Sequence, residues 1–134
     1  MRKRINCLLL AVLLVLSCGL GGCTGYVSHY KAVGFVHSNG ADSASMSFYS
    51  FEGSMVFKVR STNGSAGQLF YSGKLENGNA TVYYDYNGSK TELFRISSGG
   101  EINASIGLIE IGTVYIIVET DGSCQNGAFE FKIE

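Results

Sequence analysis

The sequence contains no proline and no tryptophan, and only two histidines among its 134 residues. Without proline, tight turns must rely on glycine, asparagine and aspartate. Without tryptophan, a sugar-stacking platform would have to be built from tyrosine or phenylalanine. His29 and His37 would lie ~26 Å apart along a regular strand, which disfavours a shared metal site or a catalytic triad.

Cysteine is scarce beyond the N-terminal segment. Cys7, Cys18 and Cys23 all lie near the N-terminus, which leaves Cys124 alone in the rest of the chain. A single thiol cannot build a disulfide framework, so stability must come from packing. No histidine neighbours Cys124 in the sequence, and we expect a half-buried loop thiol there rather than a nucleophile.

Charged residues are few and scattered. Three of the ten basic residues form Arg2-Lys3-Arg4. The other seven basic residues and all eleven acidic residues lie in residues 23–134, which therefore carry a net charge of 7 − 11 = −4. A mildly acidic domain lacks the electrostatic footprint of a protein that binds nucleic acid.

The N-terminus has the order of a secretory signal peptide: a basic start, an apolar run over residues 8–16 and then small residues. The sequence Leu20-Gly21-Gly22-Cys23 resembles the lipobox of bacterial lipoproteins. This resemblance implies that residues 1–22, a signal helix, are removed and that the Cys23 sulfur receives a diacylglyceryl (palmitate-type) anchor. Two acyl chains would hold the protein stably on the extracytoplasmic face of a bacterial cell membrane, and we expect a Gram-positive cell.

Three alternatives for this segment stay open. Cys18 follows Val15-Leu16-Ser17 and could serve as a second lipobox, although leucine at the third position before the cysteine favours Cys23. An ordinary cleaved signal would need no cysteine at the cleavage site. An uncleaved membrane helix would need ~20 apolar residues, and the apolar run is shorter than that.

Residues 23–134 form one domain whose sequence predicts β-structure throughout. Apolar residues alternate with polar ones, as in Met55, Phe57 and Val59 or in Phe129, Phe131 and Ile133. Both faces are apolar from Val114 to Val118, which predicts a central strand. Residues 38–45 are predicted to form a polar loop.

Asparagine-glycine and aspartate-glycine pairs separate these runs and indicate hairpin turns. They occur at Asn39-Gly40, Asn63-Gly64, Asn77-Gly78, Asn87-Gly88, Asp121-Gly122 and Asn126-Gly127. Together these patterns predict an all-β fold, a single antiparallel, jelly-roll-like β-sandwich of about eight strands.

From about residue 67 the strand order resembles the small exported bacterial β-sandwiches of the pre-peptidase C-terminal type. The matching segments are Gly112-Thr113-Val114-Tyr115-Ile116-Ile117-Val118 and Gly127-Ala128-Phe129-Glu130-Phe131. The resemblance covers about half of the chain and involves no catalytic motif. It implies the architecture, and by analogy an accessory or interaction role.

Two weak candidate sites lie on the segment around residue 85. Tyr83, Tyr84 and Tyr86 could contact a sugar ring, with Tyr83 expected to be the exposed one. Asp85 and Asn87 offer alternating oxygen ligands of the kind that bind Ca²⁺, but the segment lacks the distal glutamate of a calcium loop. Both residue types are also common in turns for purely structural reasons.

We therefore expect a lipid-anchored, non-catalytic binding or accessory module of the cell envelope, without a cofactor and with an unidentified envelope protein or glycan as its partner. A carbohydrate-binding module is the first alternative. A small hydrolase is the second, and it would need two convergent carboxylates. Glu110, Glu119 and Asp121 cannot be given such a geometry from the sequence.

Overall fold

The computed structural model describes residues 26–62, 67–86, 88–108 and 112–134, so the expected signal helix and Cys23 lie outside the described residues. The strands are β1 (His29–Val33), β2 (Val36–Asn39), β3 (Ser43–Arg60), β4 (Gln68–Asp85), β5 (Thr91–Ser97), β6 (Gly100–Gly107) and β7 (Thr113–Ile133). No helix within these ranges is long and apolar enough to cross a membrane.

All seven strands belong to one antiparallel sheet. The order along the sheet is β1-β3-β7-β4-β5, with β2 also beside β3 and β6 also beside β4. β7 therefore has a neighbour along both of its edges. Ile116 and Ile117 point to opposite faces of β7 and are both buried, so the prediction of a central strand is confirmed.

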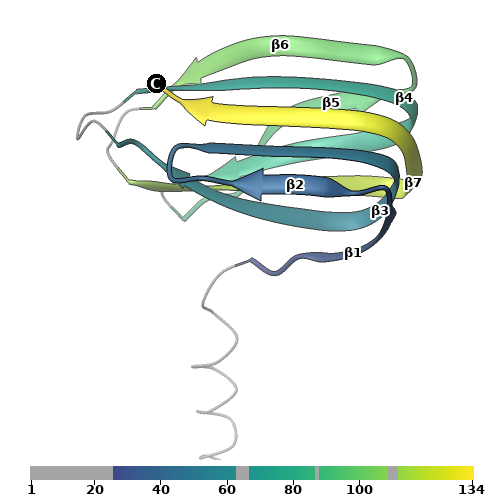
Figure 1. Cartoon of the computed structure of the whole chain (residues 1–134). Helices are drawn as coiled ribbons and strands as arrows, with labels where there is room; N and C mark the ends of the chain where they lie inside the picture. Colours follow the sequence, from purple (N-terminus) through teal and green to yellow (C-terminus); the bar gives the residue numbers. More distant parts are fainter. Residues whose placement is uncertain (1–25, 63–66, 87, 109–111) are drawn as a thin grey trace, which may run out of the picture.

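The three longest strands, β3, β4 and β7, bend sharply, and all three curve round at the right-hand end of Figure 1. Pairing shifts register between Phe51 and Ser54 in β3 and between Asn77 and Asn79 in β4. Gly53 and Gly78 lie in these shifts with φ values of 127° and 112°. Such backbone angles are accessible to glycine and strained for other residues, so glycine sets where the sheet folds over.

The folded sheet makes the two layers of a sandwich. The first layer contains β2, β6, the first halves of β3 and β4 and the second half of β7. The second layer contains β5, the second halves of β3 and β4 and the first half of β7, with β1 pairing to β3 at the bend. The all-β antiparallel sandwich is confirmed. It has seven strands because the bends join segments that were expected to be separate.

The turn dipeptides divide into two groups. Asn39-Gly40 forms the expected reversal between β2 and β3, where the Gly40 N–H donates to the Ser43 carbonyl oxygen (2.8 Å). The prediction of hairpin turns is wrong at three pairs that lie inside long strands: Asn77-Gly78, Asp121-Gly122 and Asn126-Gly127. Gly78, Gly122 and Asn126 have positive φ there, and this same backbone freedom bends a strand instead of ending it. Asn63-Gly64 and Asn87 lie outside the described residues.

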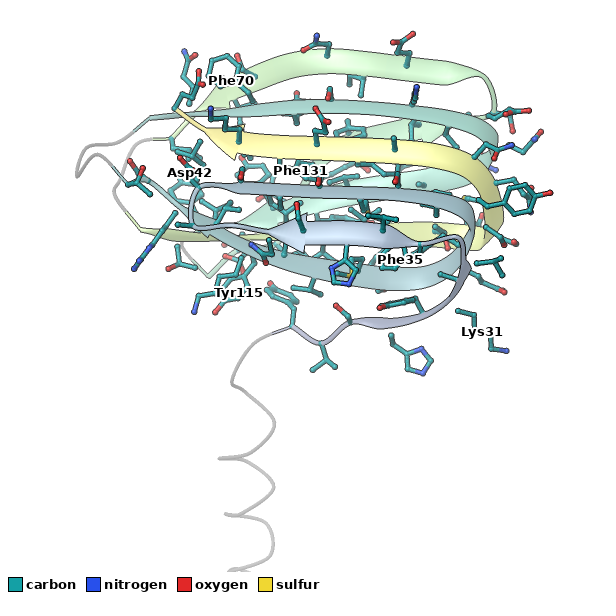
Figure 2. All side chains as sticks on the ribbon, in the orientation of Figure 1. Lys31, Phe35, Asp42, Phe70, Tyr115 and Phe131 are labelled. Atoms are coloured by element: carbon teal, nitrogen blue, oxygen red, sulfur yellow. The ribbon has the colours of Figure 1, made fainter. Side chains whose placement is uncertain are left out.

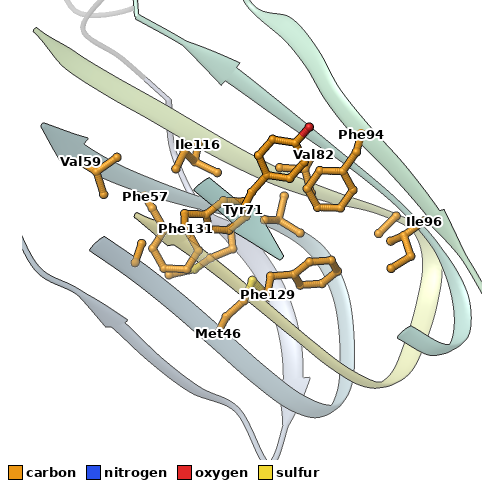
Figure 3. Packing of buried hydrophobic residues seen from close by; sticks show 14 of the residues in the cluster. Met46, Phe57, Val59, Tyr71, Val82, Phe94, Ile96, Ile116, Phe129 and Phe131 are labelled. Carbon is orange, nitrogen blue, oxygen red and sulfur yellow. The ribbon is translucent and has the colours of Figure 1, made fainter. Parts of the chain in front are cut away.

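The hydrophobic core fills the space between the layers (Figure 3). Phe57, Phe129 and Phe131 are among the fully buried side chains, and each stabilises the fold by about 1.5–3 kcal/mol through the apolar area removed from water. The alternation predicted for these segments is thus confirmed. The expectation of a half-buried loop thiol at Cys124 is wrong, because Cys124 lies within β7 and is fully buried. Burial raises the pKa of its thiol. Its Sγ donates to the Asn79 carbonyl oxygen (3.4 Å).

Candidate functional site

The three tyrosines that were predicted to contact a sugar do not share a face. Tyr83 and Tyr84 lie in β4, and Tyr86 follows it. Tyr84 and Tyr86 pack against the core, and their rings stack with centroids 6.1 Å apart and planes 7° from parallel. Tyr83 lies on the outer face of the second layer, where the Lys90 Nζ sits 4.4 Å from its ring centroid. Lys90 also forms an ion pair with Glu119 (2.8 Å), so the Tyr83 ring is partly covered.

Asp85 is the one buried charged residue among those described. Its Oδ2 accepts a hydrogen bond from the Tyr26 hydroxyl (2.5 Å) and its Oδ1 accepts one from the Gly88 N–H (2.8 Å). The hydrogen bond to Asp85 raises the pKa of Tyr26. Within the described ranges, no three His, Cys, Asp or Glu side chains gather closely enough to hold a metal, and Asn87 lies outside those ranges. Calcium binding at Asp85 stays a prediction.

Residues 26–28, which we call the N-terminal strap, run along the outside of the second layer. The Tyr26 ring packs on Tyr115, with centroids 5.6 Å apart. The Ser28 Oγ accepts a hydrogen bond from the Val56 N–H (2.9 Å). The outer face of the second layer is therefore partly occupied by the chain itself.

The outer face of the first layer differs, because no segment of the described residues crosses it. Strand pairing places its outward side chains in rows across β2, β3, β7, β4 and β6, and the third of these rows does not reach β2. The middle row consists of Ser38, Ser45, Glu130, Ser72 and Asn103. The row on one side of it consists of Val36, Ser47, Ala128, Lys74 and Glu101. The third row, on its other side, consists of Ser43, Lys132, Phe70 and Ser105. Five strands at ~4.8 Å spacing give a face ~19 Å wide.

This face is hollowed into what we call the polar groove. One part, of about 450 Å³, is lined by residues including Ser38, Ser45, Phe70, Asn103 and Lys132. Two further parts, of about 560 and 360 Å³, continue along the same face past Lys74, Glu101 and Ala128. Figure 2 shows Phe70 at the upper left of the molecule, and its strand β4 lies between β7 and β6. Neighbouring hollows share lining residues, so together they extend over most of the first layer.

The groove combines short polar side chains with a few charges and one exposed ring. Glu130 and Glu101 supply carboxylates, Lys74 and Lys132 supply ammonium groups, and Phe70 is 39% exposed. Lys132 also pairs with Glu134 (3.0 Å), and this hydrogen bond raises the pKa of Lys132. Such a surface can donate and accept many hydrogen bonds and offers an apolar ring for packing.

Sequence reasoning missed this groove. It predicted a polar loop over residues 38–45, and this is wrong at both ends, because Ser38 lies in β2 and Ser43 begins β3. The available signal was the alternation of Ser43, Ser45 and Ser47 with the buried Ala44, Met46 and Phe48. That pattern indicates a strand whose outer face is lined with hydroxyls.

No protein-family model matches this chain, and no curated protein matches it. Among solved structures, it is similar to the pre-peptidase C-terminal domain of a collagenase from Bacillus anthracis (15% identity, 81% of this chain and 90% of that one, TM-score 0.45). It is also similar to PliG, a periplasmic inhibitor of g-type lysozyme from Aeromonas hydrophila (17%, 71% and 89%, TM-score 0.48). A third is the carbohydrate-binding module TmCBM61 in complex with β-1,4-galactotriose (16%, 84% and 72%, TM-score 0.41).

Proposed function

We propose that this chain is a membrane-anchored, extracytoplasmic lipoprotein whose sandwich binds a glycan in the polar groove without catalysing a reaction. The observation that carries the proposal is the groove itself: five strands present hydroxyl, amide, carboxylate and ammonium groups beside the exposed ring of Phe70. The anchor is proposed from the lipobox at Cys23.

The chemistry of the groove suits a sugar polymer. Each sugar carries several hydroxyls that both donate and accept hydrogen bonds, and serine and asparagine side chains do the same. An aromatic ring such as Phe70 can pack against the apolar face of a sugar. A width of ~19 Å, from strand spacing, accommodates an extended ligand rather than a single small molecule.

Two acids in the groove keep a hydrolase as the second candidate. Glu130 and Glu101 stand on β7 and β6, with β4 between them. Glycoside hydrolysis needs two carboxyl groups on opposite sides of the bond that breaks. Glu119, by contrast, lies in the second layer and is paired with Lys90. Asp121 is exposed at the bend of β7, and Glu110 lies outside the described residues.

The binding test uses the full chain purified in detergent and a panel of neutral, acidic and amino-sugar polymers. We expect Phe70→Ala to weaken binding of a glycan that binds wild type by about tenfold, which corresponds to ~1.4 kcal/mol. Tyr83→Ala is the matched control, because it removes an aromatic ring from the other layer, and it should change affinity less than about twofold. If Tyr83→Ala weakens glycan binding and Phe70→Ala does not, the binding site includes Tyr83 in the second layer and not the groove. The absence of any glycan ligand would refute the proposal.

The same samples separate binding from hydrolysis. Wild type should release no reducing ends from a bound glycan over many hours. If it does release them, and if Glu130→Gln or Glu101→Gln abolishes the release while glycan binding persists, the hydrolase replaces the binding module.

The anchor has its own test. Radiolabelled palmitate should enter the wild-type chain in a bacterial host and should be absent from Cys23→Ala. Labelling that persists in Cys23→Ala and disappears in Cys18→Ala would move the anchor to Cys18.

A further inference from the structure

The N-terminal strap fixes the point at which the described domain begins. The Tyr26 hydroxyl is bonded to Asp85 and its ring rests on Tyr115. Ser28 is tied to β3 through the Val56 N–H and through Met55, whose sulfur accepts from the Ser28 hydroxyl (3.7 Å). The start of the domain is therefore held against β3, β4 and β7 and cannot swing freely.

Only two residues, Thr24 and Gly25, separate Cys23 from Tyr26. Three residue steps span at most ~10 Å even when fully extended. With the proposed lipid on Cys23, the strap must therefore lie within about one headgroup layer of the acyl chains. A domain held on so short a connection must place some part of its surface on the bilayer.

The surface next to the strap has the composition that a bilayer interface favours. Val27, in the strap, is 82% exposed, and Val33, at the end of β1, is 62% exposed. Tyr30, in β1, is 38% exposed and packs its ring on the buried Phe51 (centroids 5.2 Å apart). Lys31 extends outward from β1 (Figure 2). Exposed valines, a tyrosine and a lysine with a long apolar stem are side chains that enter the headgroup region readily.

β1 is also an edge of the sheet. Among the described strands it pairs with β3 alone, so no described strand pairs with its other side. Natural proteins usually shield such edges from other chains. β5 and β6 form the opposite side of the sandwich, at the top of Figure 1, whereas β1 is at the bottom.

We infer that the β1 edge of the sandwich contacts the lipid headgroups, with Val27 and Val33 in the interface and β6 farthest from the bilayer. This inference rests on the proposed anchor at Cys23. The polar groove then opens sideways, along the membrane surface, and Phe70 lies several strands above the lipid. In this posture the groove accepts a polymer lying outside the membrane, not the headgroup of a lipid beneath the domain.

The absence of tryptophan from the sequence makes a clean test possible. A single Val33→Trp change reports on the β1 edge, and a single Ser105→Trp change on β6 is the matched control, since both positions are exposed. Each lipidated variant, beginning at Cys23, is added to preformed vesicles of phosphatidylcholine and phosphatidylglycerol, with and without brominated acyl chains. Sedimentation of the vesicles reports the anchor separately.

We expect brominated lipid to reduce Val33→Trp fluorescence by about twofold or more, because interfacial side chains lie within ~5–10 Å of the acyl boundary. Ser105→Trp fluorescence should stay within the experimental error of its value in plain vesicles. If both variants sediment and Val33→Trp is not quenched, or Ser105→Trp is quenched equally, the proposed orientation on the bilayer is refuted while the anchor stands. If neither sediments with the vesicles, the anchor and the posture both fall, while glycan binding in detergent is unaffected.

Discussion

The two outer faces of the sandwich come from the same three bent strands, yet they differ in what covers them. On the second layer, the strap, the Lys90–Glu119 pair and the buried Asp85 occupy the face. On the first layer, no described segment crosses the rows of serines between Ser38 and Ser105. The contacts on the covered face of the second layer stabilise the domain itself, whereas the bare face of the first layer is available to a ligand.

The bend that creates the two faces should be the most sensitive point. A Cβ at Gly53 would collide with the His29 carbonyl oxygen and with the Tyr30 Cα, at a φ of +127°. We expect Gly53→Ala to destabilise the fold by about 3 kcal/mol or more, since overpacking and a strained φ each cost ~1–3 kcal/mol. Urea unfolding followed by circular dichroism measures the loss.

Gly122→Ala is the control for that change. Gly122 also has a positive φ (+75°), but a Cβ there would meet nothing within 4 Å. Its cost should be only the backbone strain, about 1 kcal/mol. Equal losses of stability in Gly53→Ala and Gly122→Ala would mean that the close approach of β1 to the bend does not contribute to the destabilisation by Gly53→Ala.

A smaller effect is expected from filling the bare face. Ser72 lies in the middle row of the groove, and Ser72→Leu should obstruct it and weaken glycan binding by about tenfold, or ~1.4 kcal/mol. Stability should change by less than about 1 kcal/mol, because the side chain points away from the core. Thr81→Leu makes a similar change on the same strand in the second layer, and it should leave glycan affinity unaltered. Weaker glycan binding by Thr81→Leu would contradict the assignment of the binding site to the first layer.

The smallest effect concerns the covered face. The hydrogen bond to Asp85 raises the pKa of Tyr26 above its ordinary value of 10.0. Because the folded state favours the neutral phenol, this contribution is fully present below pH 10 and is lost as pH rises through the higher folded-state pKa. Urea midpoints measured from pH 8 to pH 11 should therefore fall more steeply for wild type than for Tyr26→Phe. Parallel curves would show that the strap contributes no titratable stability.

Much of the architecture could be predicted from local pattern. The alternation of Met55, Phe57 and Val59 identified a half-buried strand, and the doubly apolar run around Ile116 and Ile117 identified the central one. Period-two patterning depends only on neighbouring residues, because successive side chains on a strand point to opposite faces. The orientation of Tyr83 away from the core follows from the same rule.

The site could not be predicted in this way. Ser38, Asn103 and Glu130 share one row of the groove although they lie far apart in the sequence. The turn dipeptides misled for a related reason. A positive φ at Gly78 fits a hairpin or a bend equally well, and only the pairing of β4 with β7 on both sides of it decides between them.

By itself, the sequence determined the strand-forming alternation, the inward and outward faces and the candidate lipidation site at Cys23, because each depends on a few consecutive residues. The tertiary structure decided where the sheet folds, which outer face is covered and which side chains line the groove. These features depend on the register between distant strands and on contacts such as Tyr26 with Asp85, which no local pattern specifies.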